Sequence, residues 1–388
     1  MRSTDLKFST HPPAAGMEPK VKGPTTLSRC NKQCALLLLG LTLAPFVHAQ
    51  QTRWEDLIDK AQALYREGKY DDALVPAKGA LRLAEATVGA ERIRKTATSL
   101  NNLAIIYEAR GDYKAAEPLQ GRCLTITESA LGPNHLQTAV VLNNLARVYY
   151  FEGKLAEAEP LFRRSLTIEE KLLGPEHPDV AEILDNLTSL YSAQKKYVDA
   201  EPLGKRALAI QEKTLGRDDP KVAASLNNLA EVYRAERRYV EALPLFERAL
   251  AINEKVLRPD DPGLFTNLNN LAMLYKTQGQ YTKAEPLFKR SLATAETSLG
   301  PEHPSIATML NNLAELYRVE GKFVEAEPLY KRSLAIEEKA LGPNHGDLAQ
   351  ILENYSHLLR ETNREAEGEV LDSRAKAIRA NLAQQNKK

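Results

Sequence analysis

The chain has 388 residues, of which 43% are hydrophobic and 27% are charged, and its formal net charge is +1. This near-neutral balance excludes the strong basic surplus on which nucleic-acid binding depends, so we expect no nucleic-acid partner. The length suggests two or three globular domains, but that estimate does not hold for a chain built of repeats.

The N-terminal segment, residues 1–49, differs in character from the rest. A basic stretch is followed by an apolar run from Ala35 to Val47, and Val47 and Ala49 are small residues at the positions that a signal peptidase reads. We therefore predict a signal peptide cleaved after Ala49, and an exported, most simply periplasmic, protein. The apolar run has about 13 residues, short of the roughly 20 that span a bilayer, and no other membrane segment is expected. An uncleaved anchor, a disordered leader and a start at Met17 are the alternatives.

The remainder, residues 50–388, repeats with a period of 42 residues. Tyr107, Ala116 and Pro118 each recur at this spacing through five further copies. The self-similarity divides the segment into about eight units, the last of them degenerate: 54–89, 96–133, 138–175, 180–217, 222–259, 264–301, 306–343 and 348–380.

Each unit has the apolar pattern of two amphipathic helices. In residues 178–195 and again in 197–215, apolar residues keep the three-and-four spacing of one helical face. Gly residues such as Gly153 and Gly174 follow the helices, as expected where a chain ends a helix. Pro118 and its equivalents favour a late start of the second helix, near Ala115, because proline disrupts a helix interior. Short helix pairs bury their apolar faces only by stacking, which predicts an all-α fold, a right-handed α-solenoid.

Five units carry two consecutive Asn residues in the first helix, although Asn is a poor helix former. At about 100° per residue, Leu142, Leu145 and Tyr149 share the core-facing arc, and Asn143 and Asn144 flank the opposite side. In the fourth unit Asp185 replaces the first Asn and is expected to interrupt the series. The pairs are Asn101–Asn102, Asn143–Asn144, Asn227–Asn228, Asn269–Asn270 and Asn311–Asn312.

The pattern L-x-x-L-A-x-x-Y followed by G-x-Y-x-x-A resembles the tetratricopeptide repeat. The 42-residue period and the segment AEPLFRRSLTIEEKLLGPEHPDVA are similar to the kinesin light chain type. This resemblance implies that the first helices line a concave groove in which Asn side chains hold the backbone of an extended peptide. The groove candidates are then Asn101, Asn143, Asn227, Asn269 and Asn311; the alternative is that these Asn residues only fix the stacking of the units.

Specificity is expected from inner-face positions that vary between units. Tyr150 offers an aromatic anchor, and Arg147 lies on the same face. Basic residues collect toward the C-terminal half at Arg234, Lys276 and Arg318, which favours an acidic or carboxylate-ended ligand. Solvated charge balanced by Glu231 and Glu315 is the alternative.

Other candidate chemistry has simpler explanations. His135, His177, His303 and His345 recur in G-P-x-H, but Asp219 and Asp261 occupy the same position in other units, so we predict helix caps and no metal site. Cys123 aligns with Ser and Ala residues and is predicted to be a small packing residue. Carboxylate pairs such as Glu169–Glu170 and Glu337–Glu338 are predicted to lie on a solvated face.

No catalytic or cofactor-binding motif occurs in the repeats, so neither enzymatic activity nor a cofactor is expected. The sequence therefore predicts an exported, non-enzymatic scaffold that binds a peptide or protein segment in its concave groove. A cytoplasmic adaptor of kinesin light chain type is the alternative, although no heptad coiled coil precedes the repeats. A further alternative is that the protein is a purely structural assembly factor.

Overall fold

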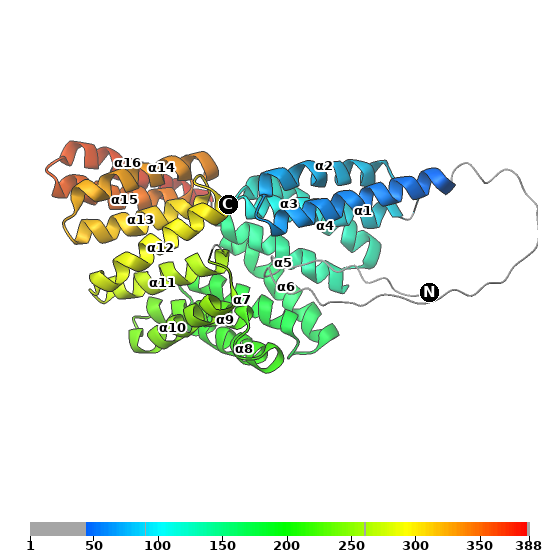
Figure 1. Ribbon diagram of the computed structural model, residues 1–388, viewed down its shortest axis with the longest axis horizontal. Helices are drawn as coiled ribbons and strands as arrows, with labels where there is room; N and C mark the ends of the chain where they lie inside the picture. The colour runs from blue at the N-terminus through cyan, green and yellow to red at the C-terminus, as the bar shows by residue number, and fades with distance from the viewer. Residues whose placement is uncertain (1–43, 90, 260, 386–388) are drawn as a thin grey trace, which may run out of the picture.

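The computed structural model describes residues 44–89, 91–259 and 261–385, and this part of the chain is all-helical (Figure 1). Its α helices are α1 (Ala44–Arg66), α2 (Tyr70–Ala86), α3 (Glu91–Ala109), α4 (Tyr113–Leu131), α5 (Leu136–Phe151), α6 (Leu155–Leu173), α7 (Pro178–Ala193), α8 (Tyr197–Leu215), α9 (Pro220–Ala235), α10 (Tyr239–Val256), α11 (Pro262–Thr277), α12 (Tyr281–Leu299), α13 (Pro304–Val319), α14 (Phe323–Leu341), α15 (Gly346–Glu361) and α16 (Glu365–Gln385).

Each odd-numbered helix pairs with the even-numbered helix that follows it, and each pair stacks on the next. Successive odd-numbered helices also pack on one another, as α5 does on α7 and α7 on α9, whereas contact between successive even-numbered helices is at most marginal among the described residues. The array therefore curves toward the odd-numbered helices, which form its concave face. The predicted all-α superhelix of stacked helix pairs is confirmed.

Small side chains allow the helices of each pair to approach closely. Ala146 and Ala158 are fully buried where α5 meets α6, and large side chains such as Phe162 and Leu190 fill the space beside them. Equivalent residues repeat along the array, for example Phe246 and its neighbours around α9 and α10. Burying each large apolar side chain contributes roughly 1.5–3 kcal/mol, so every junction adds to one continuous core.

The prediction that the second helix of each unit begins late was wrong. α4 begins at Tyr113, capped by the Asp112 side chain through Ala115 N, and Pro118 lies inside the helix. Pro118 and the equivalent prolines of the following five units are exposed. The carbonyl four residues before Pro118, that of Lys114, belongs to another exposed residue. Water can therefore hydrate the carbonyl that loses its helical partner, and the helix tolerates the proline.

The turn inside each unit requires a left-handed residue. Gly153 has φ +75°, and Gly111, Gly279 and Gly321 have nearly the same value. Lys195, Arg237 and Asn363 occupy the equivalent position with φ near +60°. For residues other than Gly and Asn, a backbone with such a φ costs about 1–2 kcal/mol of steric strain. Lys195 and Arg237 are therefore sites of local strain.

The predicted signal peptide lies mostly outside the described residues. Residues 44–49 form the start of α1, so cleavage after Ala49 would leave a shorter first helix. None of the helices described has the combination of length and apolar character needed to cross a membrane.

Candidate functional site: the concave face

The first Asn of each pair is bonded to the next unit. Asn143 Oδ1 accepts a hydrogen bond from Asn186 Nδ2 at 2.9 Å, and Asn101 Oδ1 accepts one from Asn144 Nδ2 at 2.9 Å. The same bond, always between residues 43 apart, links three further junctions at 3.0–3.1 Å: Asn227 to Asn270, Asn269 to Asn312 and Asn311 to Asn354. We call this series the Asn ladder.

The ladder limits what the groove candidates can offer a ligand. Asn101, Asn143, Asn227 and Asn311 are buried, with 0–8% of their surface exposed, and their side-chain oxygens accept hydrogen bonds within the protein. A stacking role is therefore present in the structure. The role of these Asn residues in binding a peptide stays a prediction. Because their oxygens are already bonded, the amide hydrogens would have to donate to the peptide.

The expected interruption at Asp185 does not occur. Its carboxylate takes the place of the missing amide and accepts hydrogen bonds from Ser225 Oγ at 2.5 Å and Gln211 Nε2 at 2.9 Å, and Asn228 also bonds to it. Burial raises the pKa of Asp185 to about 7, although these hydrogen bonds oppose the shift. A carboxyl group can replace an amide here because its oxygens are acceptors too.

Arg147 and Tyr150 lie at the N-terminal part of the concave face, both on α5. Arg147 forms an ion pair with Glu108 of α3. Burial raises the pKa of Glu108, although Arg147 opposes the shift. The Tyr150 ring packs edge-on against Phe151, which in turn stacks on Tyr113 with ring centroids 5.0 Å apart. Sequence reasoning did not identify Glu108 as the partner of Arg147. The 39-residue offset between the two residues, which is close to the period, is a signal that could have indicated the pair.

Arg234, Lys276 and Arg318 come from α9, α11 and α13 and lie close enough to influence one another. Arg234 is held by Glu231 through two parallel hydrogen bonds of 3.1 and 2.7 Å, and Arg318 by Glu315 through two of 2.8 Å. Lys276 has no hydrogen bond or ion pair in the part of the chain that the structure describes. Its burial, with Arg234 and Arg318 nearby, lowers the pKa of Lys276, and Glu315 opposes this. Arg318 also pairs with Glu361 of α15, so both arginines have carboxylate partners and Lys276 is the member of the cluster that has none among the described residues.

The prediction that the Glu169 and Glu337 carboxylates are solvated was wrong. Both side chains are buried, with 3% and 2% of their surface exposed, whereas Glu170 and Glu338 form ion pairs with Arg206 and Arg374 of the next unit. Burial raises the pKa of Glu169 to about 8. The inward turn of one residue in each pair follows from the 100° step between neighbours on a helix.

The recurring His residues cap helices, as predicted. Nδ1 of His135, His177, His303 and His345 accepts a hydrogen bond from the backbone N–H two residues on, at 3.1–3.3 Å, and Asp219 and Asp261 do the same through Oδ1. Among the described residues, Glu337, His345 and Asp347 could be grouped around a metal ion. Because Nδ1 of His345 is committed to its cap and the positive Lys114 lies close by, this cluster is poorly suited to a cation.

Cys123 is fully buried, and its thiol lies 3.4 Å from the Ala97 carbonyl. The equivalent Ser165 makes the same contact with Ala139 O at 2.7 Å. Burial raises the pKa of Cys123 to about 12, so the thiol is not poised to react. The predicted packing role is confirmed.

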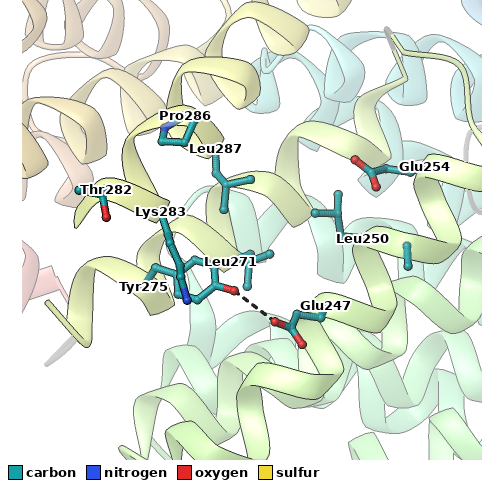
Figure 2. A pocket seen from close by; sticks show the side chains of 10 residues that line it. Glu247, Leu250, Glu254, Leu271, Tyr275, Thr282, Lys283, Pro286 and Leu287 are labelled. Carbon is teal, nitrogen blue, oxygen red and sulfur yellow. Dashed lines mark hydrogen bonds between the residues drawn. The ribbon is translucent and has the colours of Figure 1, made fainter. Parts of the chain in front are cut away.

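A shallow groove of about 500 Å³ lies away from the concave face, between α10 and α12 (Figure 2). Leu250, Leu271 and Leu287 form its floor, and the Tyr275 hydroxyl donates to Glu247 at its edge, over 3.1 Å. Tyr191, Tyr233 and Tyr317 donate to Glu residues at the matching junctions. The groove is therefore part of the repeated stacking of one unit on the next.

Comparisons with known proteins agree with the geometry. The family model of the tetratricopeptide repeat matches residues 57–129, 95–168, 138–213, 221–297 and 305–379. A solved putative kinesin light chain from Podosopora anserina, with nearly identical TPR-like repeats, is 29% identical over 53% of this chain and 98% of its own, with a TM-score of 0.43. No curated protein matches the sequence.

Two solved Rap proteins are similar in fold. The Rap conjugation gene regulator of plasmid pLS20, solved with the Phr* peptide, is 16% identical over 80% of each chain, with a TM-score of 0.61. A Rap protein solved with Competence and Sporulation Factor is 16% identical over 88% of this chain and 99% of its own, with a TM-score of 0.57.

Proposed function

Because the chain belongs to the tetratricopeptide repeat family, we propose that it is a non-enzymatic scaffold that binds an extended peptide or protein segment on its concave face. The curvature toward the odd-numbered helices supports this proposal, since it turns one face of the array inward over many units. The Rap proteins of similar fold were solved with a peptide or with Competence and Sporulation Factor, which is a second support.

The environment of Lys276 is the main observation that supports the proposal. It is a half-buried cation on the concave face without an ion-pair partner among the described residues, and Arg234 and Arg318 are near it. An unpaired charge in such a place is unfavourable unless a ligand neutralises it. The ligand we propose carries a carboxylate, either of an acidic side chain or of its C-terminus, that meets Lys276.

Tyr150 and the Asn ladder define the rest of the proposed site. The aromatic pair Tyr150 and Phe151 would hold an apolar side chain of the ligand, because aromatic residues bury a large area at low entropic cost. The amide hydrogens along the ladder would bond to the ligand backbone.

We further propose that the protein is exported, on the strength of the basic and apolar order of residues 1–49. N-terminal sequencing of the mature protein tests this. A chain beginning at Gln50 is the expected result, whereas a terminus at Met1 or Met17 would favour the cytoplasmic adaptor.

Binding is tested with fluorescein-labelled peptides of one length that differ only in being acidic, neutral or basic. We expect fluorescence anisotropy to detect selective binding of the acidic set. Lys276→Met should weaken it about tenfold, equivalent to about 1.4 kcal/mol, through loss of one charged contact. The matched control is Lys255→Met, an exposed lysine of α10 that pairs with Asp218 of the loop between α8 and α9. Equal binding of all three sets, or equal affinity of wild type and Lys276→Met, would refute the proposed ligand class.

A further inference from the structure

Two segments from opposite halves of the array meet at His303. Its Nε2 lies 3.1 Å from the carbonyl oxygen of Ala109, a residue 194 positions earlier in the chain. Ala109 ends α3 and His303 caps α13, and Figure 1 shows the start of α13 beside the turn between α3 and α4. The units from α5 to α12 therefore arch between two points that touch.

Packing at Gly111 supports the same contact. A Cβ atom added at Gly111 would lie 2.6 and 2.7 Å from Cγ and Cδ of Pro304, which is closer than van der Waals contact allows. The equivalent Gly153, Gly279 and Gly321 have the same backbone conformation, and nothing lies within 4 Å of such an atom. The close approach is thus a property of this one turn and not of the repeat.

Neighbouring turns and loops extend the contact. A Cβ at Gly68, in the turn of the first unit, would lie 3.5 Å from the Ser298 carbonyl, and one at Gly342 would lie 3.2 Å from Lys114 Nζ. Tyr113 is close enough to Glu337 and Asp347 for their charges to affect its hydroxyl. Turns of the first two units therefore face loops of the last three.

The chemistry of His303 suits a hydrogen bond in this position. Nδ1 accepts from Ser305 N at 3.2 Å, which leaves the hydrogen on Nε2 to be donated to the Ala109 carbonyl. Burial lowers the pKa of His303 to about 4, so the ring is neutral at pH 7. His135, an equivalent cap, is exposed and has only its capping bond among the described residues.

We propose that His303 and Pro304, docked on Ala109 and Gly111, form a clasp that closes the array on itself, and that opening of this clasp controls access to the concave face. The control of access rests on the proposed function, whereas the closure does not. Small contacts between parts of one chain permit relative motion. The clasp consists of one hydrogen bond, one proline and a few turn-to-loop contacts beside them, so it can open without unfolding any unit. The movement that opens the clasp is shared among many junctions, so the angle between any two neighbouring units has to change only a little.

The chain offers matched variants for the test. His303→Asp keeps the cap, since Asp219 and Asp261 cap equivalent helices, but removes the donor to Ala109. Its control is His177→Asp. Gly111→Ala introduces a Cβ against Pro304, and Gly153→Ala introduces the same strain at φ +75° in open space.

Closure is measured by pulsed electron paramagnetic resonance on the full chain, with Cys30 and Cys34 replaced by Ser and spin labels at Asp71→Cys and Glu302→Cys, two exposed sites flanking the clasp. Wild type should give a short, narrow distance distribution. His303→Asp combined with Gly111→Ala should shift it to longer distances, and the paired controls should not. A long distance in wild type, or equal shifts in test and control variants, would overturn the clasp.

Access is measured by stopped-flow association of the acidic fluorescein-labelled peptides. The open variant should bind several-fold faster than the control variant. Equal rates, with the distance shift present, would overturn the control of access and leave the closure. If no variant binds any peptide while the distances behave as expected, the proposed function fails and the closure stands.

Discussion

Asn186 Nδ2 donates a hydrogen bond of 2.9 Å to Asn143 Oδ1, which joins α7 to α5 across one junction of the array. The same pairing recurs between residues 43 apart along the chain. Asn lowers helix stability in isolation, but here each pair fixes the register of one unit on the next. The local penalty is offset because a buried amide that finds its partner specifies a single stacking geometry.

Replacing Asn143 by Ala should destabilise the array. The Asn186 amide then loses its acceptor in a largely buried site, so we expect the free energy of unfolding to fall by about 1–3 kcal/mol in urea titrations followed by circular dichroism. Asn134→Ala, at an exposed loop position, should change it by less than about 0.5 kcal/mol. In a double-mutant cycle with Asn186→Ala, purely additive losses would show that the two amides do not interact.

Asp185 should make stability depend on pH. Its pKa is about 7 in the folded chain and near 3.8 when unfolded, so the folded state holds the proton more tightly. The contribution of Asp185 is therefore greatest below about pH 4, falls as the pH rises to about 7 and is constant above. Asp185→Asn should remove this fall, and the difference in unfolding free energy from wild type should grow from pH 4 to pH 7.

The exposed Asp72 provides the control for Asp185. Glu169 also has a raised pKa and is present in both chains, so subtraction of the two pH curves isolates Asp185. A pH-independent difference between wild type and Asp185→Asn, or the same difference for Asp72→Asn, would contradict the buried titration.

Glycine at Lys195 or Arg237 should stabilise the protein. Both residues have φ near +60°, a conformation that glycine adopts without steric strain. Each substitution is expected to raise the free energy of unfolding by about 0.5–1 kcal/mol, detected as a higher melting temperature. The reverse change, Gly153→Lys, should lower it by a similar amount, about 0.5–1 kcal/mol. A loss of stability in Lys195→Gly would mean that the lysine side chain contributes more than its strain costs.

The Cys123 thiol should react slowly with a disulfide reagent in the folded protein. Burial raises its pKa to about 12 and also blocks access. In a chain with Cys30 and Cys34 replaced by Ser, labelling at pH 8 should be more than about a hundredfold slower in buffer than in denaturing urea. Comparable rates in the two solvents would mean that the α3 and α4 pair opens readily.

The sequence allowed the helix pairs, the superhelix and the capping His residues to be predicted, because each depends on local patterns that repeat in the chain. The helix start at Tyr113 could not be predicted, since the exposure that lets Pro118 be tolerated comes from tertiary packing. The burial of Glu169 and Glu337 depends likewise on the helix that packs over them.

The contact of His303 with Ala109 could not be predicted from the sequence either. His303 looks the same as the other capping His residues in the sequence, and its second bond arises only when the whole array has curved through several units. The assignment of Arg147, Tyr150 and Lys276 to a ligand site is a prediction, supported by their place on the concave face.

The central claim is that the concave face holds the ligand, and site-specific photo-crosslinking in the native compartment tests it most directly. A photoreactive amino acid at Met273, half-buried on the concave-side helix α11, is compared with one at Val240, which is 88% exposed on α10. We predict that mass spectrometry finds a defined set of acidic peptide segments joined to position 273 and absent from position 240. Crosslinks of the same segments to both positions, or to position 240 alone, would contradict a binding site on the concave face.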